Sequence, residues 1–426
     1  MEGTARPKLA VVLSGGGLRS AAQIGVLQVL EEYGLRPQCI VGTSGGAIVA
    51  ALYASGLRPQ EIAALYRSII GREHRFIDLA LGQFWQAFIS WDLSKVKGLI
   101  KGERIRKYLH KQFRLVKKFT DFTNLPPDRK AEVVELYLTA VDINDGSEVV
   151  FCKPRHELSA RYTESLEKVR LQSDISLADA VRSSIGIPGI FVPFASAGTH
   201  YVDGGLRDNL PLMVAVKLGG ADRVLGVDLG YAGLRQEALV EKGIVEILSQ
   251  SIDIMSMDQL AADIRDKELS QVPMVILNPM IYDVGLLDTE YIPEMINRGR
   301  LLAETFFARQ GLKPQLDPAE NLRLLFAGIR QPTLFPTKED DEYQLFRQQL
   351  TVTRSVASSE PTILNKVGDF FDLVREKIVL ACGLLLLACG LILVWGDPLQ
   401  VQGVGIGLII VGLVAVYRST IGVKQQ

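Results

Sequence analysis

Short apolar runs alternate with longer helix-like segments along most of the chain. Residues 9–13 form an apolar run rich in β-branched side chains, and residues 39–41 form a second one. Residues 18–33 and 45–54, which follow these runs, have the periodicity of helices. The order strand, turn, helix is therefore predicted twice near the N-terminus.

The same alternation continues further along the chain. The additional predicted strands are residues 133–142, 148–151, 224–229 and 272–277, and the additional predicted helices are residues 177–184, 243–262 and 292–308. Strands that alternate with helices are typical of a mainly parallel sheet with helices on both faces. We therefore expect an α/β fold with a mainly parallel central sheet.

The alternation fades near residue 310, where proline, glutamine and charged residues become frequent. The stretch 338–342, for example, consists only of charged residues. A change of composition of this kind indicates a domain boundary. We predict one α/β domain over residues 8–308, followed by a linker with an amphipathic helix over residues 309–377.

The C-terminal region holds two apolar runs, residues 378–394 and 401–417, each of seventeen residues without a charge. A helix rises roughly 1.5 Å per residue, so each run is at the short end of what crosses a bilayer core. Residues 396–400 would connect them. We therefore expect a transmembrane hairpin of two helices over residues 378–417; the alternative is a buried hairpin in a soluble protein.

Basic residues stand at the outer ends of this predicted hairpin. Arg375 and Lys377 precede it, Arg418 and Lys424 follow it, and the connection between the two runs has no lysine or arginine. Lysine and arginine are enriched on the cytoplasmic side of membrane helices. The pattern predicts an integral membrane protein whose α/β domain and both termini lie in the cytoplasm.

The overall composition is that of a globular protein, with 48% hydrophobic and 22% charged residues among 426. A net charge of −1 gives no reason to expect a nucleic-acid partner. The four cysteines form no CxxC pair, so no disulfide framework and no metal site are predicted. The first apolar stretch is too short for a secretory signal.

A serine stands between the second predicted strand and its helix, in the pentapeptide Gly42-Thr43-Ser44-Gly45-Gly46. The pattern GxSxG at this place is that of a nucleophile elbow, in which small residues allow the strained turn that exposes the serine hydroxyl. The helix that follows directs its positive dipole end toward developing negative charge. Ser44 is therefore the candidate nucleophile, with Gly42 and Gly46 as supporting residues; the alternative is a glycine-rich helix start.

Three consecutive glycines, Gly15, Gly16 and Gly17, follow the first predicted strand. Their amides suit a phosphate or a tetrahedral oxyanion. No lysine follows at the place that a P-loop requires, and a dinucleotide fingerprint would need a third glycine where Ser20 stands. An oxyanion hole formed by these three glycines is the interpretation that remains.

The serine also needs a base, and the chain has only four histidines, at positions 74, 110, 156 and 200. Of these, only His200 lies in a suitable place, after a strand. Close to it, Asp203 precedes Gly204 and Gly205 and offers a carboxylate instead. An aspartate can act as the base if a dry site raises its pKa and places it on the serine hydroxyl. Asp203 and His200 are therefore rival bases, and the alternative for the Asp-Gly-Gly stretch is a simple turn.

This arrangement resembles the patatin-like phospholipase family, which combines a glycine-rich oxyanion motif followed by arginine, a GxSxG serine and a downstream Asp-Gly-Gly or Asp-Gly-Ala. The resemblance covers residues from about 8 to about 228 and includes the segments 183–188 and 209–211. Ser20 is a departure, because the family usually has a glycine there, and helix packing at this point is expected to differ.

The resemblance implies a three-layer patatin-like α/β hydrolase domain and a Ser–Asp dyad without a catalytic histidine. Ser44 would attack an acyl ester, Asp203 would accept its proton, and the Gly15–Gly17 amides would hold the oxyanion. No cofactor is expected. Arg19 would hold the loop through carbonyl groups or contact a lipid phosphate; the alternative is a surface arginine at a helix start.

We expect a phospholipase or lysophospholipase that acts on membrane lipids at a bilayer. The alternatives are a transacylase or triacylglycerol lipase with the same dyad, and a catalytically idle lipid-binding protein. Residues 95–118 hold ten lysines or arginines against one glutamate, which favours contact with anionic lipid or, alternatively, forms a solvated face. The sequence leaves the oligomeric state open.

Overall fold

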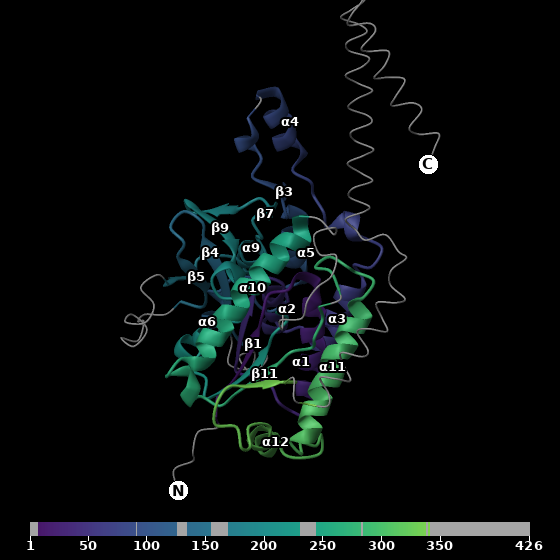
Figure 1. Cartoon of the computed structure of the whole chain (residues 1–426), viewed down its shortest axis with the longest axis vertical. Helices are drawn as coiled ribbons and strands as arrows, with labels where there is room; N and C mark the ends of the chain where they lie inside the picture. The colour runs from purple at the N-terminus through teal and green to yellow at the C-terminus, as the bar shows by residue number, and fades with distance from the viewer. Residues whose placement is uncertain are drawn as a thin grey trace, which may run out of the picture. The chain divides into compact units, whose positions relative to one another are not determined.

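The computed structural model describes residues 7–90, 92–125, 134–154, 169–230, 244–282, 284–337 and 340 (Figure 1). Its strands are β1 Leu9–Leu13, β2 Cys39–Thr43, β3 Gly98–Ile100, β4 Glu135–Asp142, β5 Glu148–Phe151, β6 Val169–Gln172, β7 Gly189–Phe191, β8 Phe194–Ser196, β9 Thr199–Asp203, β10 Arg223–Val227, β11 Met274–Leu277 and β12 Thr333–Phe335. Its α-helices are α1 Ala21–Glu32, α2 Gly45–Ala54, α3 Pro59–Arg67, α4 Leu81–Ser90, α5 Glu103–Gln112, α6 Asp121–Asn124, α9 Leu177–Ser184, α10 Ile244–Arg265, α11 Ile292–Arg309 and α12 Pro318–Leu325.

A ten-stranded sheet runs through the described part of the chain in the order β12-β11-β10-β1-β2-β4-β5-β6, and β9 and β8 branch from β4. The six strands from β12 to β4 are parallel to their neighbours. Strand β1 is buried along its whole length, as expected for a parallel strand covered on both faces. The predicted α/β fold with a mainly parallel central sheet is therefore confirmed.

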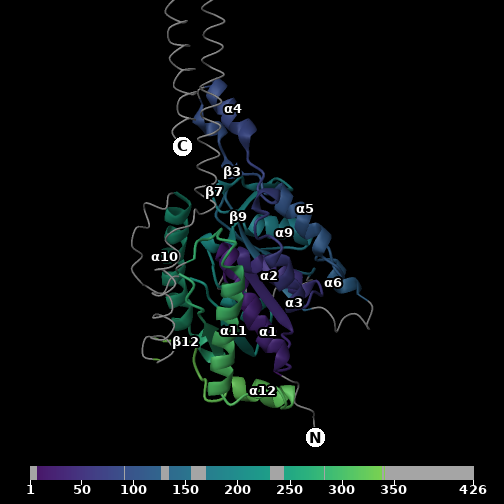
Figure 2. The same ribbon diagram turned by 90° about the vertical axis from the view of Figure 1, so that its right-hand side faces the viewer.

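Helices cover both faces of this sheet (Figures 1 and 2). On one face, alternate residues of β1 and β2 pack in a buried cluster with the segment 210–221, and α10 contributes Leu260 and Ile264. On the other face α1 packs against α11, where Gly25 and Gly299 let the two backbones approach closely. A Cβ atom on Gly25 would lie 2.0 Å from the carbonyl oxygen of Ile296. Two glycines thus fix the spacing of this helix pair.

Strand β4 pairs with two strands, β2 and β9, that are far apart in the sequence. Its residues 135–139 pair with β2, ending at the pair Thr43 and Thr139, and its residues 140–142 pair with β9, beginning at the pair Ala140 and Asp203. Strand β5 pairs with residues 138–141 of β4 and so occupies the other edge. The ends of β2 and β9 therefore meet along one edge of β4, and this junction positions the site described below.

The described chain continues beyond the predicted domain end at residue 308. Helix α12 follows α11, and β12 pairs in parallel with β11 through Val275–Leu277. The region predicted as a linker, residues 309–377, thus begins with one helix and one strand of the main sheet. The boundary at residue 308 itself stays a prediction.

The predicted transmembrane hairpin and the integral membrane location must be corrected. Among the residues that the structure describes, no helix is both long enough and apolar enough to cross a membrane. Helix α10 has 22 residues but carries charged residues at positions 246, 253, 258, 263 and 265, and charges at this density are costly in a bilayer core. Residues 378–417, on which the prediction rested, lie outside the described residues.

Candidate active site

Ser44 occupies a sharp turn between β2 and α2. Its backbone has φ 51° and ψ −123°, a conformation that is strained for a residue with a side chain. A Cβ atom on Gly42 would lie 2.6 Å from the carbonyl oxygen of Gly46, and one on Gly46 would lie 2.4 Å from that of Leu13. The glycines that flank Ser44 are therefore required for the turn to fit against β1.

Asp203 ends β9 and faces Ser44 directly. Its Oδ2 accepts a hydrogen bond from Ser44 Oγ at 2.6 Å, and its Oδ1 accepts one from the Gly205 amide at 2.8 Å. Gly204, the next residue, packs closely against β4. A Cβ atom on Gly204 would lie 2.5 Å from Thr139 Oγ1. The Asp-Gly-Gly stretch thus holds one carboxylate oxygen by backbone and leaves the other for the serine.

The carboxyl group of Asp203 is almost completely buried, with 2% of the residue exposed. Burial raises its pKa to about 7, against smaller lowering effects of the hydrogen bonds from Ser44 and Gly205. A carboxylate with a pKa in this range can accept a proton at neutral pH far better than an ordinary aspartate.

The glycine loop lies beside Ser44, and its three amides differ. The Gly15 amide donates to the carbonyl oxygen and to Oδ1 of Asn209, each at 3.1 Å. Within the described residues we find no acceptor for the amides of Gly16 and Gly17. Gly17 has φ 55°, and its Cβ would lie 2.8 Å from the carbonyl oxygen of Leu286. Two amides of the predicted oxyanion hole therefore have no acceptor in the part of the chain that the structure describes, and that of Gly15 holds the loop.

A small cavity of about 20 Å³ joins these groups. Its lining consists of Gly15, Gly16, Gly17, Ser44, Ile187, Asp203, Asn209, Ser249, Ile252, Asp253 and Leu286. This volume is about what a single water molecule requires. Among the described residues, helix α10 and the segment around Leu286 therefore leave little space beside the serine.

Arg19 points into the protein and is 6% exposed. Its Nε donates to the carbonyl oxygen of Val284 at 2.8 Å, and its Nη1 lies 3.3 Å from Oδ2 of Asp253 on α10. Burial raises the pKa of Asp253, while the charge of Arg19 and its hydrogen bond oppose this. Of the uses considered for Arg19, the structure supports the one in which it holds the loop: it ties the helical turn after the glycines to α10.

Two contacts of the site could not be read from the sequence. Ser184 Oγ, at the end of α9, accepts the backbone amide of Ser44 at 2.9 Å. Asn209 holds Gly15, as described above. Both residues belong to segments that the sequence resemblance includes, but only their contacts reveal what they do, because neither residue type carries a distinctive local pattern.

No histidine in the described part of the chain lines the cavity. His200 is exposed on β9, where it lies opposite Ala195. Side chains alternate along a strand, so His200 and Asp203 point to opposite faces of β9. His156 lies outside the described residues.

The basic run 95–118 spans α5, and its three arginines are all engaged within the protein. Arg114 pairs with Glu61 at 2.9 Å. Arg106 pairs with Glu103 and with Asp179, each at 2.9 Å. Arg104 donates to two carbonyl oxygens. Contact between the other basic residues and anionic lipid stays a prediction.

The chain is similar to a known family and to several known proteins. The profile of the patatin-like phospholipase family matches residues 11–216. The uncharacterized protein YqhO of Bacillus subtilis is 34% identical over 214 residues, which cover 48% of this chain and 66% of that protein. An uncharacterized NTE family protein of Mycobacterium tuberculosis is 25% identical over 323 residues, which cover 71% of this chain and 47% of that protein.

A named enzyme is also among the similar proteins. Lysophospholipase NTE1 of Debaryomyces hansenii is 28% identical over 221 residues, which cover 52% of this chain and only 12% of the enzyme. The chain thus spans between 12% and 66% of the length of these three relatives. The matched region of the chain contains Ser44, Asp203 and the glycine loop, and through this domain the chain belongs to the patatin-like phospholipase family.

Proposed function

We propose that the protein is a serine lipid acyl hydrolase that cleaves fatty acyl esters of phospholipids or lysophospholipids. The observation that carries this proposal is the hydrogen bond of 2.6 Å between Ser44 Oγ and the buried carboxylate of Asp203. The family and its lysophospholipase relative support the lipid class of the substrate.

In the proposed reaction, Ser44 Oγ attacks the ester carbonyl carbon while its proton passes to Asp203 Oδ2. The tetrahedral oxyanion accepts hydrogen bonds from the amides of Gly16 and Gly17, which have no other acceptor in the described structure. Removal of one such donor typically lowers the rate about 10²–10³-fold. The lysolipid or alcohol then leaves with the proton, and Ser44 carries the acyl group.

In the second half of the reaction, Asp203 takes a proton from water, and the resulting hydroxide attacks the acyl-enzyme. Collapse of the second tetrahedral intermediate breaks the bond to Ser44 and releases the fatty acid, and Asp203 returns its proton to Ser44 Oγ. The same two residues therefore serve both halves. Ser184 keeps the Ser44 backbone in place throughout, because its hydroxyl accepts the Ser44 amide.

The space that the described residues leave at Ser44 is too small for a lipid. The cavity of about 20 Å³ is far smaller than the few hundred Å³ that a lipid-sized ligand fills. Its cover is formed by α10, through Ser249, Ile252 and Asp253, and by Leu286. We infer that displacement of these segments precedes substrate binding.

Labelling and hydrolysis together test the proposal. A fluorophosphonate probe is expected to modify the wild-type chain at Ser44 and to leave Ser44→Ala unmodified, with both proteins melting at similar temperatures. In a screen of lipid classes, the wild type releases fatty acid from phospholipid or lysophospholipid, and Ser44→Ala does not. Undiminished hydrolysis by Ser44→Ala, or an unlabelled wild type without hydrolysis of any lipid, would overturn it.

Labelled substrates also separate hydrolysis from acyl transfer. Free fatty acid as the main labelled product supports the hydrolase, whereas a labelled lipid acceptor as the main product identifies a transacylase with the same nucleophile. Release of fatty acid from triacylglycerol but not from phospholipid would identify a triacylglycerol lipase that uses the same mechanism.

A further inference from the structure

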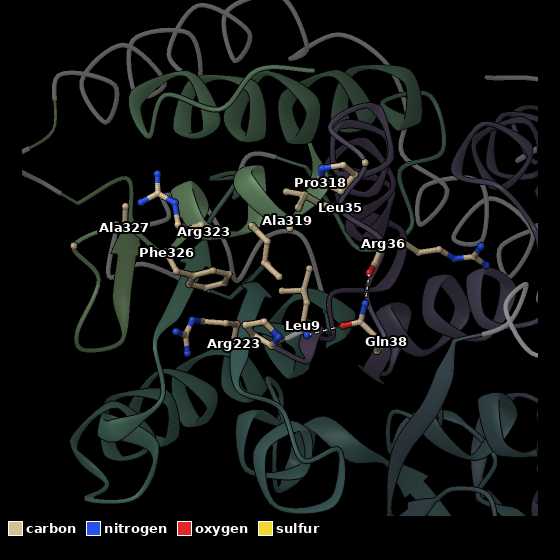
Figure 3. A pocket seen from close by; sticks show the side chains of 14 residues that line it. Leu9, Leu35, Arg36, Gln38, Arg223, Pro318, Ala319, Arg323, Phe326 and Ala327 are labelled. Carbon is tan, nitrogen blue, oxygen red and sulfur yellow. Dashed lines mark hydrogen bonds between the residues drawn. The ribbon is translucent and has the colours of Figure 1, made fainter. Parts of the chain in front are cut away.

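A second cavity, of about 820 Å³, opens at the end of the sheet where the parallel strands begin (Figure 3). It lies between the start of β1, the connection from α1 to β2, the start of β10, and α12 with the residues after it. Its lining consists of Pro7, Leu9, Gly34, Leu35, Arg36, Gln38, Arg223, Pro318, Ala319, Leu322, Arg323, Phe326, Ala327 and Gly328. We call this cavity the α12 groove. Its volume is that of a site for a small molecule.

The α12 groove has an apolar floor. Leu9, Leu35 and Phe326 are buried, with 1%, 3% and 6% of each residue exposed, and Leu322 is half-buried beside them. Figure 3 shows Leu9 and Phe326 projecting toward the centre of the groove. The three buried side chains form the apolar wall beneath the groove, and Leu322 supplies apolar surface that a hydrocarbon chain would cover, at about 25 cal/mol per Å² buried.

The rim of the α12 groove is cationic. Three arginines line the groove, and no aspartate or glutamate does. Arg323 and Arg223 lie on either side of Phe326 at one end of the groove, and Arg36 lies at the opposite end (Figure 3). Arg323 is already engaged by Glu320, whose two carboxylate oxygens accept hydrogen bonds from its Nε at 2.8 Å and its Nη2 at 2.6 Å. A ligand would therefore have to share or displace this exposed ion pair. In the described structure Arg223 donates to a neutral acceptor, the carbonyl oxygen of Asp222, at 2.7 Å, so its charge is available to a ligand.

The α12 groove is separate from the site at Ser44. Leu9 begins β1 at the groove, and Leu13 ends β1 immediately before the glycine loop. A strand rises about 3.3 Å per residue, so the two sites lie at opposite ends of β1, roughly 13 Å or more apart. The two linings share no residue. A ligand in the α12 groove would therefore not touch the reacting groups.

We propose that the α12 groove binds a single-chain amphipathic anion, with its acyl chain on the Leu9, Leu35 and Phe326 floor and its carboxylate or phosphate on Arg223 and Arg323. An apolar floor beside two guanidinium groups matches this chemistry, because arginine binds carboxylate and phosphate through paired hydrogen bonds. A free fatty acid and a single-chain lysophosphatidate both combine one acyl chain with an anionic head group. The proposal does not depend on the chemistry of Ser44.

Direct binding to the full-length chain tests the proposal. Dissociation constants are measured by calorimetry for palmitate and for palmitoyl lysophosphatidate below their critical micelle concentrations, with hexadecanol and butyrate as probes that lack the charge or the chain. The Ser44→Ala protein is used, so that lysophosphatidate is not consumed. Tighter binding of palmitate indicates a fatty-acid site and tighter binding of lysophosphatidate a lysolipid site. We expect the double variant Arg223→Glu/Arg323→Glu to bind either anion at least tenfold more weakly.

A matched control addresses the change of charge. Arg67 is exposed on α3, away from the groove, and Arg67→Glu tests the effect of a reversed arginine charge elsewhere. It should leave binding unchanged. Leu322→Glu should weaken binding by placing a carboxylate on the floor. Equal binding by the double variant and the control, or equal binding of palmitate and hexadecanol, would overturn the proposal.

The location is checked independently with a photoreactive fatty acid. A diazirine near the end of the acyl chain is expected to label peptides that contain residues 31–38 or 318–328, and mass spectrometry identifies them. Labelling confined to peptides around Ser44 and Asp203 would place the ligand in the active site and contradict the proposal. Fluorophosphonate labelling of wild-type Ser44 is measured on the same samples, so that a failure of the proposed function is recognised separately.

Discussion

Ser44 Oγ and Asp203 Oδ2 lie 2.6 Å apart although 159 positions separate the two residues in the chain. The distance follows from β4, which pairs first with β2 and then with β9 along one edge. Thr43 and Asp203 lie opposite neighbouring residues of β4, Thr139 and Ala140. The dyad is thus set by the register of three strands.

Asp203→Asn should abolish ester hydrolysis, and His200→Ala should retain it. The amide of asparagine cannot accept the Ser44 proton, whereas His200 points away from the cavity. Hydrolysis of a soluble short-chain ester measures both variants, and we expect a loss of at least about 10³-fold for Asp203→Asn, the scale of losing a general base. If His200→Ala lost activity to the same extent, the histidine would take the role of base.

The rate should rise with pH around neutrality. Burial raises the pKa of Asp203 to about 7, and only the ionised carboxylate can act as the base. The value of kcat/KM is therefore expected to increase as pH rises through about 7, and to level off above it, because Asp203 is protonated at lower pH. A soluble ester without titrating groups gives the cleanest profile. A rate that stays constant between about pH 5 and pH 9 would contradict this assignment.

Ser184→Ala should slow the reaction without unfolding the protein. The substitution leaves the buried amide of Ser44 without its acceptor, at a cost of about 1–3 kcal/mol, and loosens the position of the nucleophile. We expect kcat to fall roughly tenfold or more while KM for a soluble ester changes little. Ser183→Ala is the matched control, because Ser183 is equally buried but donates to the carbonyl oxygen of Asp179. Equal effects of the two variants on kcat would contradict a specific role of Ser184 in positioning Ser44.

Gly17→Ala should damage the oxyanion loop more than backbone strain alone explains. Gly17 has φ 55°, and its Cβ would lie 2.8 Å from the Leu286 carbonyl oxygen. Gly220 has a similar φ of 60° but an open environment. Gly220→Ala therefore reports the strain, about 1–2 kcal/mol, with activity intact. Thermal unfolding and ester hydrolysis should show a larger loss of both properties for Gly17→Ala; similar stability and activity of the two variants would argue against a tightly held loop.

Glu148→Gln should stabilise the protein at pH 8 but not at pH 4. Burial raises the pKa of Glu148 to about 7; the charge of Arg207 lowers this pKa, and the charge of Asp263 raises it. The Oε1 atom of Glu148 has no hydrogen-bond partner within the described structure. Because the folded-state pKa lies above that of the unfolded chain, the wild type loses stability as pH rises toward 7. Glutamine carries no charge and avoids this loss. Melting temperatures of both proteins across this pH range measure the effect.

Glu135→Gln should change the stability in the opposite direction and serves as the control for Glu148→Gln. Burial alone would raise the pKa of Glu135, but hydrogen bonds from Lys8 and Tyr137 and the charges of Lys8 and Lys153 lower it to about 2. Ionised Glu135 therefore stabilises the fold above the unfolded-state pKa, and the substitution should destabilise the protein at neutral pH. That difference should shrink as pH falls toward 2. The same sign for both variants at pH 8 would contradict the assigned ionisation states.

The pattern of apolar residues was enough to predict the central elements. The expected strands at residues 9–13 and 148–151 and the expected helices at residues 45–54 and 177–184 match β1, β5, α2 and α9 residue by residue. Residues 9–13, 148–151 and 45–54 are short, largely apolar runs bounded by glycine or polar residues, and residues 177–184 have helical periodicity. Local pattern and final structure agree there because nearly all apolar residues of these segments are buried in the fold.

Pairings between distant segments were not predictable in this way. Strand β12 has only three residues, two of them exposed, and it becomes a strand only because β11 offers an edge. Ser184 and Asn209 act on Ser44 and Gly15 across contacts that no local pattern encodes. The antiparallel pairing of β4 with β5 and β9 likewise depends on tertiary packing. The residue types of the dyad could be inferred from the chain, but the groups that hold them could not.

The pairing of β12 with β11 also determines where the chain can be shortened. A protein ending at residue 308 would lack β12, and the backbone groups of Val275, Ile276 and Leu277 on that edge would lose their partners. All three side chains are fully buried in the intact chain. An apolar strand with an open edge is a template for pairing with another copy. Aggregation is therefore the expected fate of such a fragment, whereas one that retains residues up to 337 keeps the edge closed.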